Sequence, residues 1–304
     1  MGQYLSLISL LLMAVRLSAT LLLLRDCPSD FEVLLINRSQ NLSLAGLFLF
    51  PGGKLDEEDS SPEILDYFGI QAAPVPYVNR AQMLEMASLK ICGLRETYEE
   101  TGILIGNPNV VASLPFREIC KQVKEKPCLR DLRFFLRIVT PKGLPAPADA
   151  SFFITQVPYD SQVTLNPTES SEFLWVKPFT ALKMYEECCL KLASPQVLAL
   201  YLLAHFDSIE GLLEAVSRVE YEVDLPEISQ EDHNLCWYKG DFRHTQTPLW
   251  QRAAKCENWM HVLPVENSQL YKLDSIKPDL TASAPYALEV VDGVLMRKPK
   301  ARLC

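Results

Sequence analysis

The stretch from Leu84 to Ile103 reads LEMASLKICGLRETYEETGI and carries the strongest structural signal in the chain. Its apolar side chains recur at intervals of three and four residues, which at about 100° per residue aligns them in one stripe along a helix. The stripe consists of Leu84, Ala87, Ile91, Leu94 and Tyr98. Gly102 follows as a stop signal, so we predict a helix from about Leu84 to Thr101.

The same stretch carries three glutamates, Glu96, Glu99 and Glu100, which are spaced i, i+3 and i+4. On a helix this spacing presents the three carboxylates to one region of space, roughly opposite the apolar stripe. Like charges this close destabilise a helix unless a cation lies among them. Carboxylate oxygens are hard ligands that suit Mg²⁺ or Mn²⁺, and these ions suit phosphate oxygens. An isolated Glu-x-x-Glu-Glu is more often a solvated acidic face, so the neighbouring motifs decide between the two interpretations.

Those neighbouring motifs resemble a known signature. The segment from Arg95 to Ile103 resembles the second half of the Nudix box, R-E-U-x-E-E-x-G-U, except that Thr97 stands where the pattern has a bulky aliphatic residue. The letters FPGG at 50–53 resemble the approach to the box. Gly53, with five residues before Asp59, resembles the opening G-x5-E, with Asp in place of Glu. This context favours a metal site over a solvated acidic face.

The spacing within the box departs from the family pattern. The box has seven residues between its first acid and the arginine, whereas 35 residues separate Asp59 from Arg95. About 28 residues are therefore inserted before the helix, in a loop where added length costs little free energy. The coenzyme A diphosphatase branch of the Nudix family has such an interrupted box, and the segments 52–62 and 91–97 look like that branch, including Thr97. The resemblance covers roughly Arg16 to Phe206.

The resemblance implies a role for each matching residue. Glu96, Glu99 and Glu100 match the metal ligands of the family, and Gly52 matches a residue that adds its backbone carbonyl as a ligand. Arg95 matches the residue that orients these carboxylates by charge-assisted hydrogen bonds. The ion, Mg²⁺ or Mn²⁺, would activate a water that attacks phosphorus. Glu99 and Glu100 are both candidates for the base that takes the proton of this water.

Further charged residues are candidates for catalysis and for binding the substrate. Glu169 and Glu172 lie where some Nudix enzymes keep an additional acid, although Glu172 is equally interpreted as a polar strand edge. The letters LLINRS at 34–39 begin the signature of coenzyme A-cleaving relatives, but the spaced arginine that should follow is missing. Arg38 is a candidate for binding phosphate and could equally pair with the acidic loop. Lys54 is the second candidate for phosphate binding.

The order of expected elements indicates an α/β fold, a Nudix-like α/β/α sandwich with a mixed sheet. We predict an apolar segment over residues 1–15, a Nudix domain over 16–206 with an insertion at about 60–84, and a C-terminal extension over 207–304. Prolines make the stretch 57–81 unsuitable for regular structure. A helix is expected to begin with Ser194 as its cap. Strands are expected at 19–24, 33–36, 47–50, 132–139 and 172–176.

Composition limits the partners and the location of the protein. A formal net charge of -9 supplies no broad positive field for nucleic acid, so none is expected as a partner. Nine cysteines without a C-x-x-C pair argue against a disulfide framework and favour a reducing compartment. The apolar N-terminus leaves membrane attachment open, because Gly2 fits the loose myristoylation pattern and Arg16 interrupts a bilayer span. Relatives of the branch are peroxisomal or mitochondrial, but a tail ending in Cys304 lacks the peroxisomal signal, so location stays open.

Three functions fit the sequence. The first is hydrolysis of the pyrophosphate in coenzyme A or an acyl-coenzyme A, as the branch resemblance implies. The second keeps the chemistry and changes the substrate to another nucleoside diphosphate derivative, such as ADP-ribose or a dinucleotide. The third is an inactive Nudix-like binding module, against which the complete set of Arg95, Glu96, Glu99 and Glu100 argues.

Overall fold

The computed structural model describes residues 16–28, 30–39, 46–70, 80–107, 114–140 and 148–217, together with short strands beyond residue 217. The expected apolar segment at 1–15 and most of the expected C-terminal extension lie outside the described residues. Among the helices that are described, none is both long enough and apolar enough to span a membrane.

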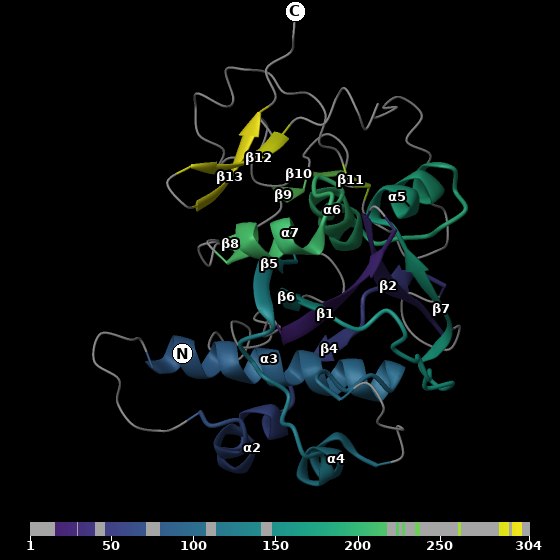
Figure 1. Ribbon diagram of the computed structural model, residues 1–304. Coiled ribbons are helices and arrows are strands. Elements are labelled where there is room, and N and C mark those ends of the chain that lie inside the picture. The colour runs from purple at the N-terminus through teal and green to yellow at the C-terminus, as the bar shows by residue number, and fades with distance from the viewer. Residues whose placement is uncertain are drawn as a thin grey trace, which may run out of the picture.

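A mixed sheet of eight strands forms the centre of the molecule (Figure 1). Its main path runs β3-β2-β1-β6-β5-β8, while β4 pairs with the first half of β1 and β7 pairs with β2. The pairs β1–β6 and β5–β8 are parallel, and the other pairs are antiparallel. The strands are β1 (Arg16–Cys27), β2 (Asp30–Arg38), β3 (Phe48–Leu49), β4 (Gly52–Lys54), β5 (Arg133–Val139), β6 (Ala148–Gln156), β7 (Ser170–Val176) and β8 (Val223–Asp224).

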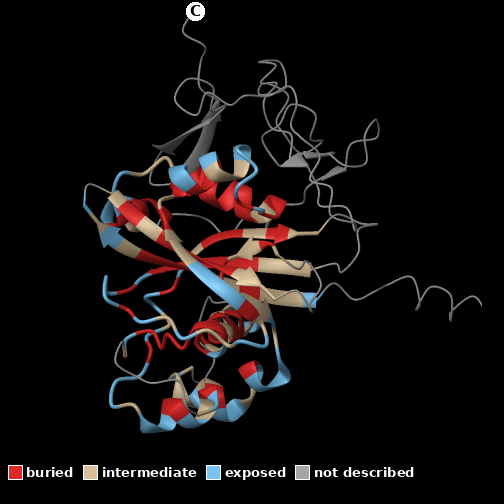
Figure 2. Cartoon of the chain, turned by 90° about the vertical axis from the view of Figure 1, so that its right-hand side faces the viewer, coloured by how far each residue is buried: buried red, intermediate tan, exposed pale blue. Residues whose placement is uncertain are grey.

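Helices cover both faces of this sheet. Along β1 the buried leucines alternate, so Leu21 and Leu23 pack in one core with α3 while Leu22 and Leu24 pack in a second core with α6. Figure 2 shows that buried residues follow the sheet and the helix sides that face it. This arrangement confirms the predicted α/β/α sandwich with a mixed sheet. The helices are η1 (Glu57–Ser60), α2 (Pro62–Tyr67), α3 (Arg80–Thr101), α4 (Phe116–Gln122), α5 (Pro178–Glu186), α6 (Ser194–Leu203) and α7 (Ile209–Val216).

The helix predicted from the opening stretch is α3, which begins four residues earlier than expected, at Arg80, and ends at Thr101. All residues of the predicted stripe after Leu84 are buried in α3. Gly102 has φ 71°, a conformation that glycine adopts without strain, and its N–H donates to the carbonyl of Tyr98 at 2.8 Å. The helix therefore stops where its last glutamate, Glu100, reaches the sheet.

Two local expectations are wrong. The stretch 57–81 was expected to lack regular structure, yet it contains η1 and α2, because Pro62 occupies the first turn of α2, where a proline is tolerated. Ser61 caps that helix by accepting from the N–H of Ile64 at 3.4 Å. Ser194 does not act as the N-cap of α6: the cap position is Ala193, without a side-chain hydrogen bond, and Ser194 is the first helical residue.

Candidate active site

Arg95 lies at the centre of the candidate site, on the last turns of α3. Its guanidinium forms two hydrogen bonds with the carboxylate of Asp59, at 2.8 Å to Oδ1 and 2.9 Å to Oδ2. The remaining nitrogen, Nη1, donates to Glu96 at 2.9 Å and to Glu99 at 3.0 Å. Because one guanidinium contacts three carboxylates, it fixes the acidic side of α3 to the loop that follows β4.

Asp59 connects Arg95 to the backbone of this loop. Its side chain is only 2% exposed, and Oδ2 also accepts from the N–H of Asp56 at 2.9 Å. Asp56 in turn accepts from the N–H of Glu58 at 2.9 Å, so the two aspartates cap η1 reciprocally. Arg95 reaches the preceding strand as well, through a hydrogen bond of 3.1 Å to the carbonyl of Lys54. The loop after β4, which carries Asp59 from the first half of the Nudix-like motif, is thereby held against α3.

Glu100 occupies the most buried position of the three glutamates, with 5% of its surface exposed. Its Oε2 accepts a hydrogen bond of 2.9 Å from the N–H of Gly52. Gly52 has φ 156°, and a Cβ at this position would overlap the carbonyl oxygen of Ala19 on β1. Glycine is therefore required here so that β4 can lie against β1 and direct its N–H to Glu100.

Burial raises the pKa of all three glutamates. For Glu96 and Glu99 the loss of solvation is the largest cause, and the charge and hydrogen bond of Arg95 oppose it. For Glu100 burial raises the pKa to about 8, against the hydrogen bond from Gly52. The negative charge of Glu169 contributes to the raised pKa of both Glu99 and Glu100. The carboxylates are thus crowded in a poorly solvated place, where a cation would stabilise their charged forms.

Gly53 also lies in close contact with this cluster. A Cβ built on Gly53 would overlap all three atoms of the Glu96 carboxylate group. The carbonyl of Gly53 lies 3.7 Å from the thiol of Cys92, one helical turn before Glu96. Because Gly53 has no side chain, it leaves the space into which the Glu96 carboxylate extends.

We expect Gly53→Ala to displace the Glu96 carboxylate and to lower turnover by roughly 10- to 100-fold, the range typical for disturbing a supporting contact of a metal ligand. Gly93→Ala is the matched control, because a Cβ there would meet only Ala19 and Leu21 at 3.7 and 3.9 Å. Gly93 lies within α3, so this control is expected to keep activity and to gain about 0.5–1 kcal/mol of stability. Steady-state kinetics and thermal unfolding of both variants check this. Equal activities for the two would contradict the assigned contact.

The loop before β7 closes over the end of α3, a contact that no sequence pattern indicated. The N–H of Thr164 donates to the carbonyl of Thr101 at 2.7 Å, and that of Asn166 donates to the carbonyl of Glu100 at 3.1 Å. Glu169 follows in this loop, and its carbonyl accepts from the N–H of Ser39 at 2.8 Å. The loop therefore contacts both the end of β2 and the end of α3.

Glu172 has a hydrogen-bond partner on the neighbouring strand. It is exposed on β7, opposite Asn37 of β2, and its Oε1 accepts a hydrogen bond of 2.8 Å from the Asn37 side chain. The charge of Glu169 contributes to the raised pKa of Glu99 and Glu100. The catalytic role that the sequence predicts for Glu172 stays a prediction.

The two predicted phosphate-binding residues are placed differently. Arg38 ends β2, and its positive charge lowers the pKa of Glu100, so it lies near the cluster. Lys54 ends β4 with an exposed side chain, and the contact to Arg95 comes from its backbone carbonyl. The roles that the sequence predicts for Arg38, Lys54 and the α3 glutamates stay predictions.

No family model matches the chain. The acyl-coenzyme A diphosphatase NUDT19 of Xenopus laevis is 26% identical over 277 residues, which cover 72% of this chain and 73% of that protein. The protein of the same name from Gallus gallus is 25% identical over 245 residues, which cover 61% of this chain and 64% of that protein. The matched part is thus less than two thirds of the Gallus gallus protein.

Among solved structures, a Nudix hydrolase from Alicyclobacillus acidocaldarius superposes with a TM-score of 0.53 at 25% sequence identity. The match covers 66% of this chain and 95% of that chain. The chain has the Nudix hydrolase fold. The resemblance found in the sequence, to Nudix hydrolases and to their coenzyme A diphosphatase branch, is confirmed. These relatives support an enzyme that hydrolyses a pyrophosphate bond.

Thr97 is the one departure within the second half of the Nudix box, and the structure shows what it does. The side chain is fully buried, and its hydroxyl has no hydrogen-bond partner. The position is therefore a packing position, as in the Nudix pattern, although threonine leaves an unsatisfied polar atom there.

The donor set of the Nudix box fits a divalent cation. Within the part of the chain that the structure describes, no three His, Cys, Asp or Glu side chains already surround one point as metal ligands do. Two of the glutamates instead turn to Arg95, and the third turns to Gly52. The cluster nevertheless gathers the carboxylates of Asp59, Glu96 and Glu99 around the guanidinium of Arg95, with Glu100 on the same helix. Oxygen donors with an excess of negative charge are those that Mg²⁺ or Mn²⁺ require.

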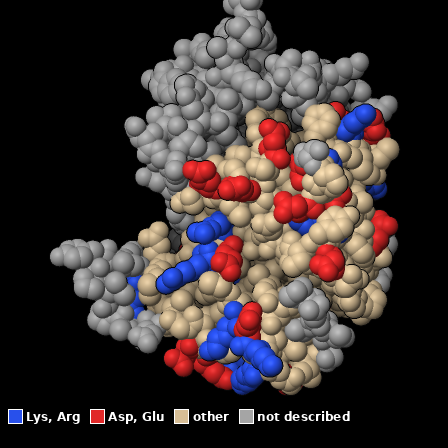
Figure 3. Space-filling view, viewed as in Figure 1, with Lys and Arg blue, Asp and Glu red and all other residues tan. Residues whose placement is uncertain are grey.

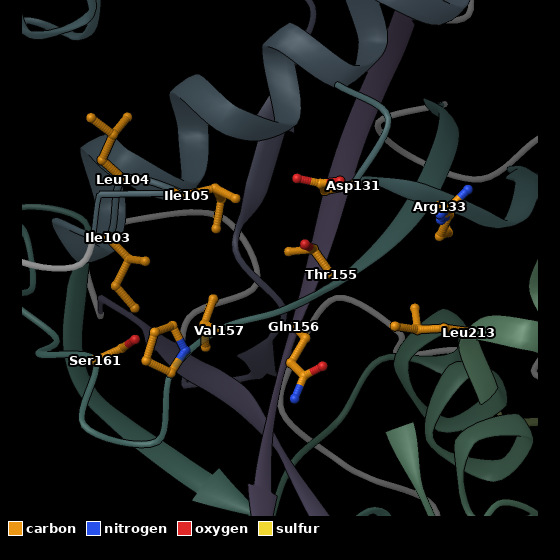
Figure 4. A pocket seen from close by; sticks show the side chains of 12 residues that line it. Ile103, Leu104, Ile105, Asp131, Arg133, Thr155, Gln156, Val157, Ser161 and Leu213 are labelled. Carbon is orange, nitrogen blue, oxygen red and sulfur yellow. The ribbon is translucent and has the colours of Figure 1, made fainter. Parts of the chain in front are cut away.

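The surface has two further features. On the face shown in Figure 3, basic and acidic side chains are interspersed over η1, α2 and α4, where Arg117 pairs with Glu58 at 3.4 Å and Lys121 with Glu63 at 2.9 Å. A pocket of about 370 Å³ lies where β6 ends and β5 begins, with walls that include Ile103 and, on α7, Leu213 (Figure 4). None of the predicted site residues lines this pocket.

Proposed function

We propose that the chain is a metal-dependent diphosphatase that hydrolyses the pyrophosphate bond of coenzyme A or of an acyl-coenzyme A. The products would be adenosine 3′,5′-bisphosphate and 4′-phosphopantetheine or its acylated form. The observation that carries the proposal is the set of three buried or half-buried glutamates at the end of α3, held by Arg95 and by the N–H of Gly52. The glutamates are Glu96, Glu99 and Glu100.

These three glutamates would bind a Mg²⁺ or Mn²⁺ ion, with the carbonyl of Gly52 as a further ligand. When bound, the ion would neutralise the charge of the pyrophosphate and lower the pKa of an attacking water. The water would add to phosphorus as the bridging P–O bond breaks. Glu99 is the most exposed of the three, at 41%, which supports it over Glu100 as the base that takes the proton of the water.

The substrate assignment has separate support. The two curated relatives are named as acyl-coenzyme A diphosphatases, and they match this chain over more than half of its length. The charge of Arg38 reaches the buried Glu100, so a phosphate bound by Arg38 would lie beside the glutamates. Lys54, with its exposed side chain on β4, is the second residue that we propose for phosphate binding.

Turnover of coenzyme A, an acyl-coenzyme A and ADP-ribose by the full chain tests this function. Each substrate is incubated with Mg²⁺, with Mn²⁺ and with a chelator, and the products are separated and quantified. Cleavage of the coenzyme A compounds that disappears with the chelator is the expected result. Cleavage of ADP-ribose alone would keep the chemistry and replace the substrate class. Failure to cleave any of the three, together with tight binding of one of them, would favour a binding module.

Glu169→Gln is expected to lower kcat by roughly 10- to 100-fold, because the charge of Glu169 raises the pKa of Glu99 and Glu100 and its carboxylate would act with them on the attacking water. Glu172→Gln is the matched control and is expected to lower kcat less than about twofold, since its carboxylate is exposed and bonded to Asn37. Kinetics of both variants at saturating Mg²⁺ check this. A larger loss of kcat in Glu172→Gln than in Glu169→Gln would identify Glu172 as the additional acid.

A further inference from the structure

Phe173 of β7 lies on the same face of the sheet as the catalytic helix α3. In the β2–β7 ladder Phe173 is opposite Ile36, and Trp175 is opposite Leu34. Ile36 and Leu34 belong to the core that packs against α3, and Trp175 packs against the same core. Because side chains alternate along a strand, Phe173 shares this face with Trp175, while Glu172 points to the other side with Asn37.

The ring of Phe173 is unusually open for a residue in that position. It is 44% exposed, although its partner Ile36 is almost fully buried. Two other large hydrophobic side chains in the described residues are exposed, Tyr159 at 62% and Phe179 at 46%. Tyr159 lies 4.8 Å from the guanidinium of Arg25, and Phe179 lies on α5, in the opposite layer. Phe173 is therefore an exposed aromatic surface on the side of the glutamates.

The polar neighbours of Phe173 fix where a substrate would lie. Arg38 is two residues beyond Ile36 on β2 and lies opposite Ser170 at the start of β7, after an irregularity in the ladder between Asn37 and Arg38. The N–H of Ser39, next to Arg38, donates to the carbonyl of Glu169 at 2.8 Å, and the N–H of Asn166 in the same loop donates to the carbonyl of Glu100 at 3.1 Å. The end of β2 therefore lies beside the end of α3, and Ile36 and Phe173 are the next residue pair along the β2–β7 ladder on the α3 face. If Arg38 and the glutamates bind a phosphate, the part of the substrate attached to that phosphate can extend over Ile36 and Phe173.

Trp175, at the other end of β7 on this face, is covered by the side chain of Arg25. The guanidinium of Arg25 lies 4.3 Å from the ring centre of Trp175 and pairs with Glu32 at 2.7 Å. It also donates to the carbonyl of Tyr159 at 3.2 Å. The rings of Trp175 and Tyr159 thus both lie against the guanidinium of Arg25, whereas Phe173 is two residues closer to the Arg38 end of β7.

We propose that Phe173 is the stacking platform for the planar base of the nucleotide half of the substrate. This assignment rests on the proposed function, because it places the base next to a phosphate bound at Arg38 and the glutamates. An exposed phenylalanine offers a flat apolar face to any base, and such stacking typically changes binding by about 5- to 100-fold. Stacking on Phe173 makes the enzyme prefer nucleotide-containing pyrophosphates over alkyl pyrophosphates and leaves the identity of the base weakly selected.

Binding of AMP and of ribose 5-phosphate, measured by calorimetry in the presence of Mg²⁺, tests the platform. These probes share the sugar and phosphate and differ by the base, and neither has a pyrophosphate to be cleaved. We expect the full chain to bind AMP at least about 5-fold more tightly than ribose 5-phosphate. Phe173→Leu should bring this ratio close to one, whereas Phe173→Trp should keep it.

Phe179→Leu is the matched control, since Phe179 is 46% exposed and belongs to the opposite layer; its ratio should equal that of the parent. Thermal unfolding verifies that every variant is folded. A preference for AMP that survives in Phe173→Leu, or no preference for AMP in the parent, overturns the platform. The test is independent of turnover. An inactive protein whose preference for AMP depends on Phe173 would refute the diphosphatase function and keep the stacking platform. An active protein whose AMP to ribose 5-phosphate ratio is unchanged in Phe173→Leu would keep the function and refute the platform.

Discussion

Glu100→Gln is expected to lower kcat/KM by at least about 10³-fold, equivalent to roughly 4 kcal/mol of transition-state stabilisation. Glu100 is the most buried of the three glutamates and is positioned by the N–H of Gly52. Glutamine keeps its size but supplies no negative charge to a cation or to the reacting water. Steady-state kinetics with the substrate that the parent protein cleaves, across a range of Mg²⁺ concentrations, measure the loss.

Glu85→Gln is the matched control for this substitution. Glu85 lies on the same helix, is 39% exposed and pairs with Arg137 at 3.2 Å. We expect its activity to equal that of the parent and its stability to change by less than about 1 kcal/mol. If Glu100→Gln kept more than a tenth of the parent activity, Glu100 could not be an essential ligand or base.

The stability of the metal-free protein supplies a second readout on Glu100. Burial raises the pKa of Glu100 in the folded state to about 8, while the unfolded chain has a value near 4.5. Between these values the folded state retains a proton that the unfolded state releases, so stability falls as the pH rises. The melting temperature of the metal-free parent should therefore decrease, relative to Glu100→Gln, from about pH 5 to pH 8. Added Mg²⁺ should offset the decrease at pH 8 in the parent alone.

Arg95→Ala is expected to lower the free energy of unfolding by about 3–5 kcal/mol, because it leaves the buried Asp59 without its bidentate partner. Activity should be lost at the same time, since Glu96 and Glu99 lose the guanidinium that holds them. Arg95→Lys should recover only part of the stability, because an ammonium group cannot form the two parallel hydrogen bonds to Asp59. Chemical denaturation of the metal-free proteins measures these differences.

Arg117→Ala is the control, because Arg117 also contacts two acids, Glu58 and Glu63, but near the surface. Exposed pairs contribute little, so a loss of less than about 1 kcal/mol is expected. Similar losses for Arg95→Ala and Arg117→Ala would mean that Asp59 does not depend on Arg95. In that case another group would have to solvate this buried carboxylate.

Much of the fold follows from local sequence patterns. The apolar stripe predicts α3 to within four residues at its start, and Gly102 marks its end, because helix geometry repeats regardless of the surroundings. Strand β6 was not predicted. Its sequence, ADASFFITQ, shows no regular alternation, and its strand conformation is stabilised by pairing with β1 on one side and β5 on the other. Such pairing joins segments far apart in the chain, which a local pattern does not reveal.

The helices of the stretch 57–81 were missed for a different reason. Prolines there indicated a loop, but the effect of a proline depends on its position in a helix, and Pro62 stands in the first turn of α2. Ser61 completes this start with its side chain. The prolines of this stretch therefore indicate a loop or a helix start only when the helix boundary is known.

By itself, the sequence determined that Glu96, Glu99 and Glu100 share one side of a helix, since intervals of three and four residues fix this on any α-helix. It also located the two glycines and Arg95 that the motif requires. Only the tertiary structure decided which groups meet these carboxylates: the N–H of Gly52 on Glu100, and the loop before β7, whose Asn166 N–H donates to the Glu100 carbonyl. The physical reason is that solvation and charge at a site depend on segments brought together by long-range packing, whereas the direction of a side chain on a helix depends on the helix alone.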